Sequence, residues 1–319
     1  MSKLSEFDIS FNSFNHLEKI SPWLLHNITS ELWLGGNNLT GLFPWKFQNV
    51  GSKLTVLDIS DNFLHGTLPG DIDLNLPHPC HLDLSNNTFN GSLPPFFGDQ
   101  LQMLDLSDNQ FQGEIPHSMI SNMSSLLYLS FQEHSHVSCR RAWSRNLFDI
   151  QNNEFSGELS WYLPVLPKLK YLLLGGNRFE GQIPRQVCQM RDLHVLDVTR
   201  KCLSGEILDF VDNVTCCTWT DNSQGFNLEI DYLDNIEIFN KGALLTYYRL
   251  PPYLRGTDVS SNKLTGQIPI QMTRLEMILF LNMSTSLLTG QTPSSLANLT
   301  VLQSLHLSHN SLFVTIPLN

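Results

Sequence analysis

Aspartates recur at one position of a sequence repeat along the chain, and carboxylates brought close together are a common basis of general acid–base catalysis. Each stands four residues before a recurring polar position, which is asparagine in most copies. The set is Asp8, Asp58, Asp83, Asp105, Asp149, Asp197 and Asp258. Regular repetition brings such residues side by side in any stacked structure, so carboxylate pairs are weak evidence for catalysis. We expect these aspartates to be structural or solvated.

Other signs of catalytic or metal chemistry are weak. His134, His136 and Cys139 form an HxHxxC pattern, but no fourth zinc ligand stands at a suitable spacing. The chain has no G-x-S-x-G elbow, no Walker A loop and no HExxH motif. A net charge of -11 without a basic patch argues against nucleic-acid binding. The sequence therefore predicts a recognition protein with no catalytic residue, no metal and no cofactor.

The recurring polar position marks a sequence repeat in the frame LxxLxLxxNxFxGxIP. Its twelve copies are Asn12, Asn37, Asn62, Asn87, Asn109, His134, Asn153, Asn177, Lys201, Asn262, Ser286 and Asn310. Most intervals are 22 to 25 residues, but the interval from His134 to Asn153 is 19 and that from Lys201 to Asn262 is 61. The pattern predicts one shortened unit and one unit with a large insertion.

One well-formed unit, residues 54–69, shows how each copy is expected to fold. Leu54, Leu57 and Ile59 face inward and alternate with outward residues, as a short strand requires. Asn62 then turns the chain, and its amide can pair with backbone groups that would otherwise be buried without partners. A single unit cannot bury its apolar face, so stability requires stacking of the units.

Several segments carry a specific family resemblance. They are LTGLFP (39–44), FQGEIP (111–116), FEGQIP (179–184), VSSNKLTGQIP (259–269) and LANLTVLQSLHLSHNSL (296–312). With these endings the chain resembles the ectodomain of a plant extracellular leucine-rich-repeat receptor-like protein. The resemblance implies an α/β leucine-rich-repeat solenoid, curved as a horseshoe or superhelix, with a parallel β-sheet on its concave face and about 12 repeats.

The intervals divide the chain into three parts. Residues 1–207 hold repeats 1–9, within which residues 133–146 abandon the pattern. Residues 208–252 hold the insertion, which is called an island in the family that the chain resembles. Residues 253–319 hold repeats 10–12 and end without a cap.

The sequence shows no signal peptide at its start and no run of about 20 apolar residues that could cross a bilayer. We therefore expect an internal fragment or truncated product of a longer receptor-like protein, with hydrophobic surface exposed at both ends of the stack.

Sequons and cysteines favour the secretory route. Eight N-x-Ser/Thr sequons predict glycosylation at Asn27, Asn38, Asn86, Asn90, Asn122, Asn213, Asn282 and Asn298. The six cysteines fit an oxidising compartment but form no metal frame. Pairing of Cys188 with Cys202, or with Cys216 or Cys217, is left open.

Two groups of residues are candidate ligand contacts. On outward strand positions, the departures from a polar pattern are Trp33, Tyr128, Tyr171, Leu173, Phe280 and His306. Exposed aromatic side chains are favoured binding anchors, although lateral packing between repeats is the alternative. In the acidic island the candidates are Asp231, Asp234, Glu237 and Lys241, and the alternative is a solvated loop. A glycan on Asn282 would obstruct the groove.

The resemblance implies a cell-surface receptor-like protein without a kinase, on the extracellular face of the plasma membrane or in the apoplast. It would bind a peptide, a protein or a cell-wall-derived ligand and signal through a partner receptor-like kinase, in defence or development. The alternatives are a soluble apoplastic leucine-rich-repeat inhibitor of a wall-degrading enzyme, and a non-functional truncated paralogue.

Overall fold

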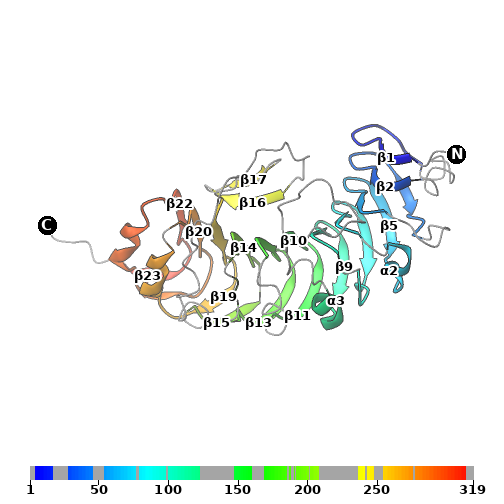
Figure 1. Cartoon of the computed structure of the whole chain (residues 1–319). Coiled ribbons are helices and arrows are strands. Elements are labelled where there is room, and N and C mark those ends of the chain that lie inside the picture. The colour runs from blue at the N-terminus through cyan, green and yellow to red at the C-terminus, as the bar shows by residue number, and fades with distance from the viewer. Residues whose placement is uncertain are drawn as a thin grey trace. The chain divides into compact units, whose positions relative to one another are not determined.

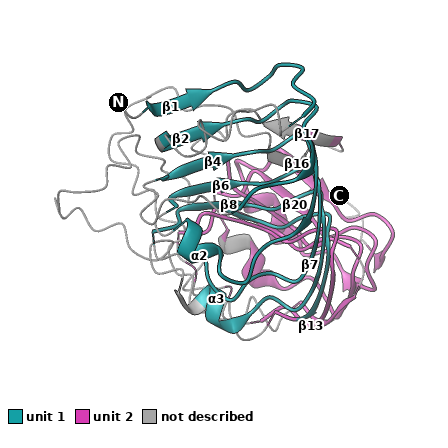
Figure 2. Cartoon of the chain, turned by 90° about the vertical axis from the view of Figure 1, so that its right-hand side faces the viewer, with its two compact units in different colours: residues 1–157 teal, residues 158–319 magenta. Residues whose placement is uncertain are grey.

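The computed structural model describes residues 4–16, 28–45, 54–76, 79–97, 100–122, 147–159, 169–184, 187, 190, 192–200, 202–207, 236–240, 243–247, 254–275 and 277–313. The chain divides into two compact units, Met1–Gly157 (unit 1) and Glu158–Asn319 (unit 2), which are coloured separately in Figure 2. Each unit is a stack of turns with one short strand before each recurring turn position and, in most turns, a second strand after it (Figure 1).

The main sheet of unit 1 contains the strands before the turns. They pair in parallel in the order β1 (Leu4–Asp8), β2 (Ile28–Trp33), β4 (Val56–Asp58), β6 (His81–Asp83), β8 (Met103–Asp105) and β10 (Leu147–Asp149). Figure 2 shows β1 to β8 stacked in this order. The register aligns equivalent repeat positions, since Val56 stands opposite His81 and His81 opposite Met103. Inward side chains such as Leu57 and Leu82 are therefore stacked and almost fully buried.

A second parallel sheet follows the turns, and we call it the flank sheet. In unit 1 its strands are β3 (Thr40–Leu42), β5 (Phe63–Thr67), β7 (Thr88–Gly91), β9 (Gln110–Gly113) and β11 (Glu154–Glu158), followed in two repeats by the helices α2 (Ile72–Asn75) and α3 (His117–Asn122). Beneath it, Phe89, Phe111 and Phe155 stack with ring centroids 6.3 Å and 6.2 Å apart. The phenylalanine of the frame NxFxG therefore forms a stacked column of buried rings along these repeats.

Unit 2 repeats the arrangement. Its main strands are β12 (Tyr171–Leu173), β14 (Val195–Asp197), β18 (Gly256–Asp258), β20 (Phe280–Asn282) and β22 (Ser304–His306). Its flank strands are β13 (Arg178–Gln182), β15 (Leu203–Glu206), β19 (Lys263–Thr265), β21 (Thr289–Gln291) and β23 (Ser311–Phe313). Two 3₁₀ helices, η6 (Ile270–Arg274) and η7 (Ser294–Asn298), and an antiparallel hairpin of β16 (Ile236–Asn240) and β17 (Ala243–Tyr247) complete the unit. Figure 1 shows β14, β20 and β22 on one side of this unit and β13, β15 and β19 on the other.

The recurring turn asparagines, which we call the asparagine ladder, join neighbouring turns by hydrogen bonds. The Nδ2 group of Asn62 donates to the carbonyls of Ile59 and Ser60 in its own turn and to the carbonyl of Leu34 in the turn before, at 2.7 to 3.2 Å. Its Oδ1 accepts the backbone N–H of Leu39 at 2.9 Å. The predicted role of these amides, to satisfy buried backbone groups, is confirmed.

The predicted repeat fold with a parallel sheet is confirmed. The described residues form eleven main strands, whereas about 12 repeats were expected. Strand β8 pairs directly with β10, and the Asn153 amide hydrogen-bonds to the backbone of Leu106 and Phe111. The repeat expected around Phe131 and His134 falls outside the described residues.

The long interval from Lys201 to Asn262 is spanned without an additional main strand, because β14 pairs directly with β18. The hairpin β16–β17 lies within this interval in the sequence. The three-part division at residues 207 and 252 stays a prediction.

Candidate recognition surface

The outward face of the main sheet carries the residues four and six positions before each turn, and we call it the outer face. Its aspartates form part of the turns. In unit 1, Asp58 Oδ1 accepts the backbone N–H of Ser60 at 2.9 Å and its hydroxyl at 2.7 Å. The same pair of bonds joins Asp83 to Ser85, and Asp258 accepts the N–H of Ser260 at 2.9 Å. The expectation that these aspartates are structural is therefore confirmed.

The candidate contact Trp33 is packed between repeats. It is 7% exposed, forms a buried cluster with Val56 and meets His81 edge-on, with ring centroids 5.5 Å apart. Its Nε1 donates to Glu31 Oε2 at 3.3 Å. These contacts join β2, β4 and β6, which is the lateral packing considered as the alternative for this residue.

In unit 2 the candidates Tyr171, Leu173 and Phe280 are also buried, with exposed fractions of 4%, 0% and 2%. Tyr171 meets His194 edge-on at 5.8 Å, and the Phe280 ring lies over Gly256 so closely that a methyl group there would overlap it. The expected exposure of these side chains and of Trp33 is wrong, because strands about 4.8 Å apart let large side chains cover their neighbours. Their role in binding stays a prediction.

The remaining contact candidates are placed differently. His306, at the end of β22, is half-buried. Glu237 belongs to β16, whereas Tyr128, Asp231, Asp234 and Lys241 lie outside the described residues.

A polar row crosses the outer face of unit 2. The register places Asp197 opposite Asp258 and Asp258 opposite Asn282, which in turn stands opposite His306. Burial, and then the charge of Asp258, raise the pKa of Asp197 to about 7. Burial also raises the pKa of Asp258, although the hydroxyl and N–H of Ser260 and the Asn282 amide oppose that rise. Burial therefore favours the protonated form of both carboxyl groups.

The Asn282 amide is part of this row. Its Nδ2 donates to Asp258 Oδ2 at 2.9 Å and to Ser260 Oγ at 3.2 Å, and its Oδ1 accepts both the N–H and the hydroxyl of Ser284. The residue is 4% exposed. The nitrogen to which a glycan would be attached is thus buried and hydrogen-bonded.

The other sequons are placed as follows. Asn38, Asn86, Asn90 and Asn298 are exposed, Asn122 ends α3, and Asn27 and Asn213 lie outside the described residues. Cys80 is disulfide-bonded, whereas Cys202 is a half-buried free thiol. The free thiol excludes the pairing of Cys188 with Cys202, while the other open pairings involve residues that are not described.

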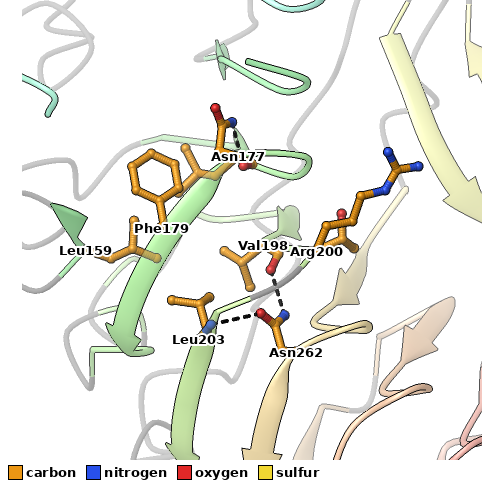
Figure 3. A pocket seen from close by; sticks show the side chains of 9 residues that line it. Leu159, Asn177, Phe179, Val198, Arg200, Leu203 and Asn262 are labelled. Carbon is orange, nitrogen blue, oxygen red and sulfur yellow. Dashed lines mark hydrogen bonds between the residues drawn. The ribbon is translucent and has the colours of Figure 1, made fainter. Parts of the chain in front are cut away.

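Figure 3 shows a small cavity in unit 2. The cavity holds about 10 Å³ and is lined by Asn177, Phe179, Leu203 and Asn262 among others. That volume suits about one water molecule. The cavity is therefore too small for a ligand.

Across the part of the chain that the structure describes, no group of three or more His, Cys, Asp or Glu side chains could hold a metal ion. In the same part of the chain, no helix is both long and apolar enough to cross a membrane.

The comparisons agree with this architecture. The model of the Leucine Rich Repeat family matches residues 53–74, 79–99, 100–122 and 168–190. The fold resembles the plant peptide hormone receptor RGFR1 in complex with RGF2, with a TM-score of 0.61, 24% identity and coverage of 98% of this chain and 48% of that chain. It also resembles the Arabidopsis receptor kinase HAESA in complex with the peptide hormone IDA and the co-receptor SERK1, with a TM-score of 0.59, 23% identity and coverage of 98% and 50%.

The stacked parallel strands and the recurring turn asparagines define a leucine-rich-repeat fold. Among the curated proteins, Receptor-like protein 18 of Arabidopsis thaliana is 28% identical over 318 residues, covering 84% of this chain and 38% of that protein. The chain is a homologue of the plant leucine-rich-repeat receptor-like proteins, and it spans less than half the length of this relative. That family is non-catalytic, so the prediction that the chain is not an enzyme is confirmed.

Proposed function

We propose that the chain is a ligand-recognition region of a plant cell-surface receptor-like protein that lacks a kinase. It binds an extracellular peptide, protein or cell-wall-derived ligand on the outer face of its main sheet. It signals through a partner receptor-like kinase, in defence or development. The observation that carries this proposal is the homology to receptor-like proteins over 84% of the chain.

The separation of structural positions from variable outward positions within each repeat supports this role. Inward residues build the core, and the aspartates and asparagines fix the turns, so the same backbone can carry different outward side chains. At the position four before the turn, the sequence departs from aspartate with Trp33, Leu173, Asn282 and His306. Variation on a constant scaffold is typical of a binding surface.

A peptide is the ligand class that we favour. Two of the solved structures with the same fold are complexes of peptide hormone receptors, and one of them also holds a co-receptor. Within this class, the proposed contacts are Trp33 in unit 1 and, in unit 2, Tyr171, Phe280 and His306, of which the half-buried His306 is accessible. Tyr128, Leu173 and the four island residues remain proposed contacts as well.

An extracellular location follows from the same proposal. Four of the sequons, at Asn38, Asn86, Asn90 and Asn298, are exposed and accessible to the glycosylation machinery. A secreted, disulfide-containing product fits the cystine at Cys80, because disulfides persist in oxidising compartments.

The proposal is tested by panning a random twelve-residue peptide library against the secreted 319-residue chain. We expect enriched peptides to bind at least tenfold more weakly to His306→Ala, because this change removes an accessible polar group of the outer face. His309→Ala is the matched control, since His309 is exposed at a turn outside that face. Equal binding by both variants, or no enriched peptide, would refute peptide recognition on this surface.

A further inference from the structure

Two exposed apolar side chains interrupt the outward face of the flank sheet in unit 1. Leu42 in β3 is 68% exposed and Phe63 in β5 is 58% exposed. Among the described residues on the flank strands of this unit, they are the only large hydrophobic side chains that are exposed. Outward positions of the following strands hold polar residues, such as Thr88 and Gln110. We call Leu42 and Phe63 the apolar patch.

Strand pairing brings the two side chains of the apolar patch together. Phe63 stands opposite Thr40, and Leu42 stands opposite His65. A strand spacing of about 4.8 Å and a rise of about 3.3 Å per residue put diagonal neighbours such as Leu42 and Phe63 about 8 Å apart. The Leu42 side chain also lies against β5, since a methyl group added at Gly66 would overlap its Cδ2 atom. The two side chains therefore form a continuous surface rather than isolated exposures.

A glycosylation sequon lies beside the apolar patch. Asn38, Leu39 and Thr40 form the sequon NLT. Asn38 and Thr40 are exposed while Leu39 is fully buried, so the Asn38 side chain is on the same face as Thr40 and Phe63. Because Thr40 is directly opposite Phe63, Asn38 is a diagonal neighbour of that ring, at about 8 Å.

The Asn38 amide is available for modification. Its backbone N–H donates to the carbonyl of Phe14 at 2.8 Å, but within the part of the chain that is described its side chain makes no hydrogen bond. Other sequon amides are engaged. Asn86 Nδ2 donates to Asp61 Oδ1 at 2.6 Å, and the buried Asn282 donates to a carboxylate and a hydroxyl.

We propose that the core sugars of an N-linked glycan on Asn38 pack on the apolar patch. The first N-acetylglucosamine is joined directly to the Asn38 amide, and one face of its pyranose ring presents C–H groups. The Phe63 ring offers a flat apolar surface to that face. Leu42 lies further along the same side of the sheet, where it continues the surface for the second N-acetylglucosamine. This inference rests on the extracellular location that the proposed function includes.

Asn90 provides an internal control in the same sheet. Asn90, Gly91 and Ser92 form a sequon, and Asn90 is exposed on β7. The residues opposite it on the neighbouring strands are Thr67 and Gln110. Both are polar, so a glycan on Asn90 has no aromatic ring at the paired positions on which to pack.

The test compares the two sites in the full chain, secreted from plant cells treated with kifunensine so that all N-glycans are oligomannose. Endoglycosidase H cuts between the two core sugars, and mass spectrometry follows the cut at each site in the native protein. Sugars held on the ring must detach first, so the rate falls with the detached fraction. We expect the cut at Asn38 to be about fivefold slower than at Asn90, the scale of one aromatic contact. Isolated glycopeptides should be cut at equal rates.

Substitution of the ring tests its role directly. Phe63→Ser should raise the rate at Asn38 about fivefold and change the rate at Asn90 by less than about twofold. Phe63→Trp keeps an aromatic surface and should keep the protection. The matched control is Leu74→Ser, which removes an apolar side chain that is 75% exposed on α2 of the same unit. It should leave both rates unchanged.

Several results would overturn the proposal. One is an equal rate at Asn38 in the parent chain and in Phe63→Ser. Another is Phe63-dependent self-association of the glycosylated chain in sedimentation velocity, which would assign the apolar patch to a second copy. A glycan at Asn90 but none at Asn38 would remove this inference and leave the extracellular location standing. Absence of glycans from every exposed sequon would refute both.

Discussion

Replacing one asparagine of the ladder should lower the free energy of unfolding by an amount that can be estimated from its hydrogen bonds. In Asn62→Ala the side chain loses four hydrogen bonds, but its three carbonyl partners each keep another donor. Leu34 O still accepts from Asn37 Nδ2, Ile59 O from Asn87 Nδ2, and Ser60 O from the N–H of Gly36, all at 2.9 to 3.0 Å. Only the N–H of Leu39 loses the acceptor that Asn62 Oδ1 provides.

The expected loss of stability follows from this count. A buried donor left without an acceptor costs about 1 to 3 kcal/mol, and each weakened carbonyl interaction adds a fraction of a kcal/mol. We therefore expect Asn62→Ala to lower the free energy of unfolding by about 2 to 4 kcal/mol. That is a large part of the stability of a typical domain.

Urea unfolding followed by tryptophan fluorescence and circular dichroism measures the change. Because repeat arrays need not unfold in two states, hydrogen exchange at the Leu39 amide gives a local check, and its protection should fall. Gln112→Ala, which removes an exposed amide from β9, is the control and should change stability by less than about 0.5 kcal/mol.

The converse change provides a second check of the same reasoning. Ser286 stands at a ladder position, is 8% exposed, and its Oγ has no hydrogen-bond partner. Ser286→Asn should therefore raise stability by about 1 kcal/mol. If Asn62→Ala costs no more than Gln112→Ala, the asparagine ladder is not a source of stability and the argument is refuted.

Two other predictions concern unit 2. Since the folded pKa of Asp197 is raised from 3.8 to about 7, the folded state binds the proton more tightly, and stability falls as pH rises from about 4 to about 7. Asp197→Asn should remove this fall and be more stable than the parent above pH 7 by a few kcal/mol. His194 contributes the opposite slope between about pH 3 and pH 6.5 in both proteins, so the decisive measurement is the difference between their urea-unfolding pH profiles. Parallel profiles would refute the link between the pKa of Asp197 and stability. Glycopeptide mass spectrometry of the secreted chain should find glycans at exposed Asn38 and Asn90 and none at Asn282, whose buried amide binds Asp258; an occupied Asn282 in folded protein would contradict the geometry.

Local relations in the sequence predicted much of this structure. The inward positions, the turn asparagines and the structural aspartates could be assigned because their contacts lie two or three residues away or one repeat away. Asp58 with Ser60 is an example of the first kind, and Asn62 with Leu34 of the second. A strict period converts such short-range rules into a fold, since each turn repeats the environment of the last.

The flank sheet was missed, although its signal is present in the sequence. In residues 63–67, Leu64 is buried while Phe63, His65 and Thr67 are exposed, which is the alternation of a strand. The pairing of β5 with β3 and β7 depends on residues more than 20 positions apart, so a single copy does not reveal it.

By itself the sequence determined the repeat fold, its buried columns and the absence of catalytic motifs, because these follow from periodicity and residue type. Only the tertiary structure decided that β8 meets β10, that Trp33 and Phe280 are buried, and that Cys202 is a free thiol. It likewise placed Phe63 beside the sequon of Asn38. The physical reason is that exposure, charge coupling and strand pairing depend on neighbours supplied by other turns, across intervals as long as 61 residues where the repeat is interrupted.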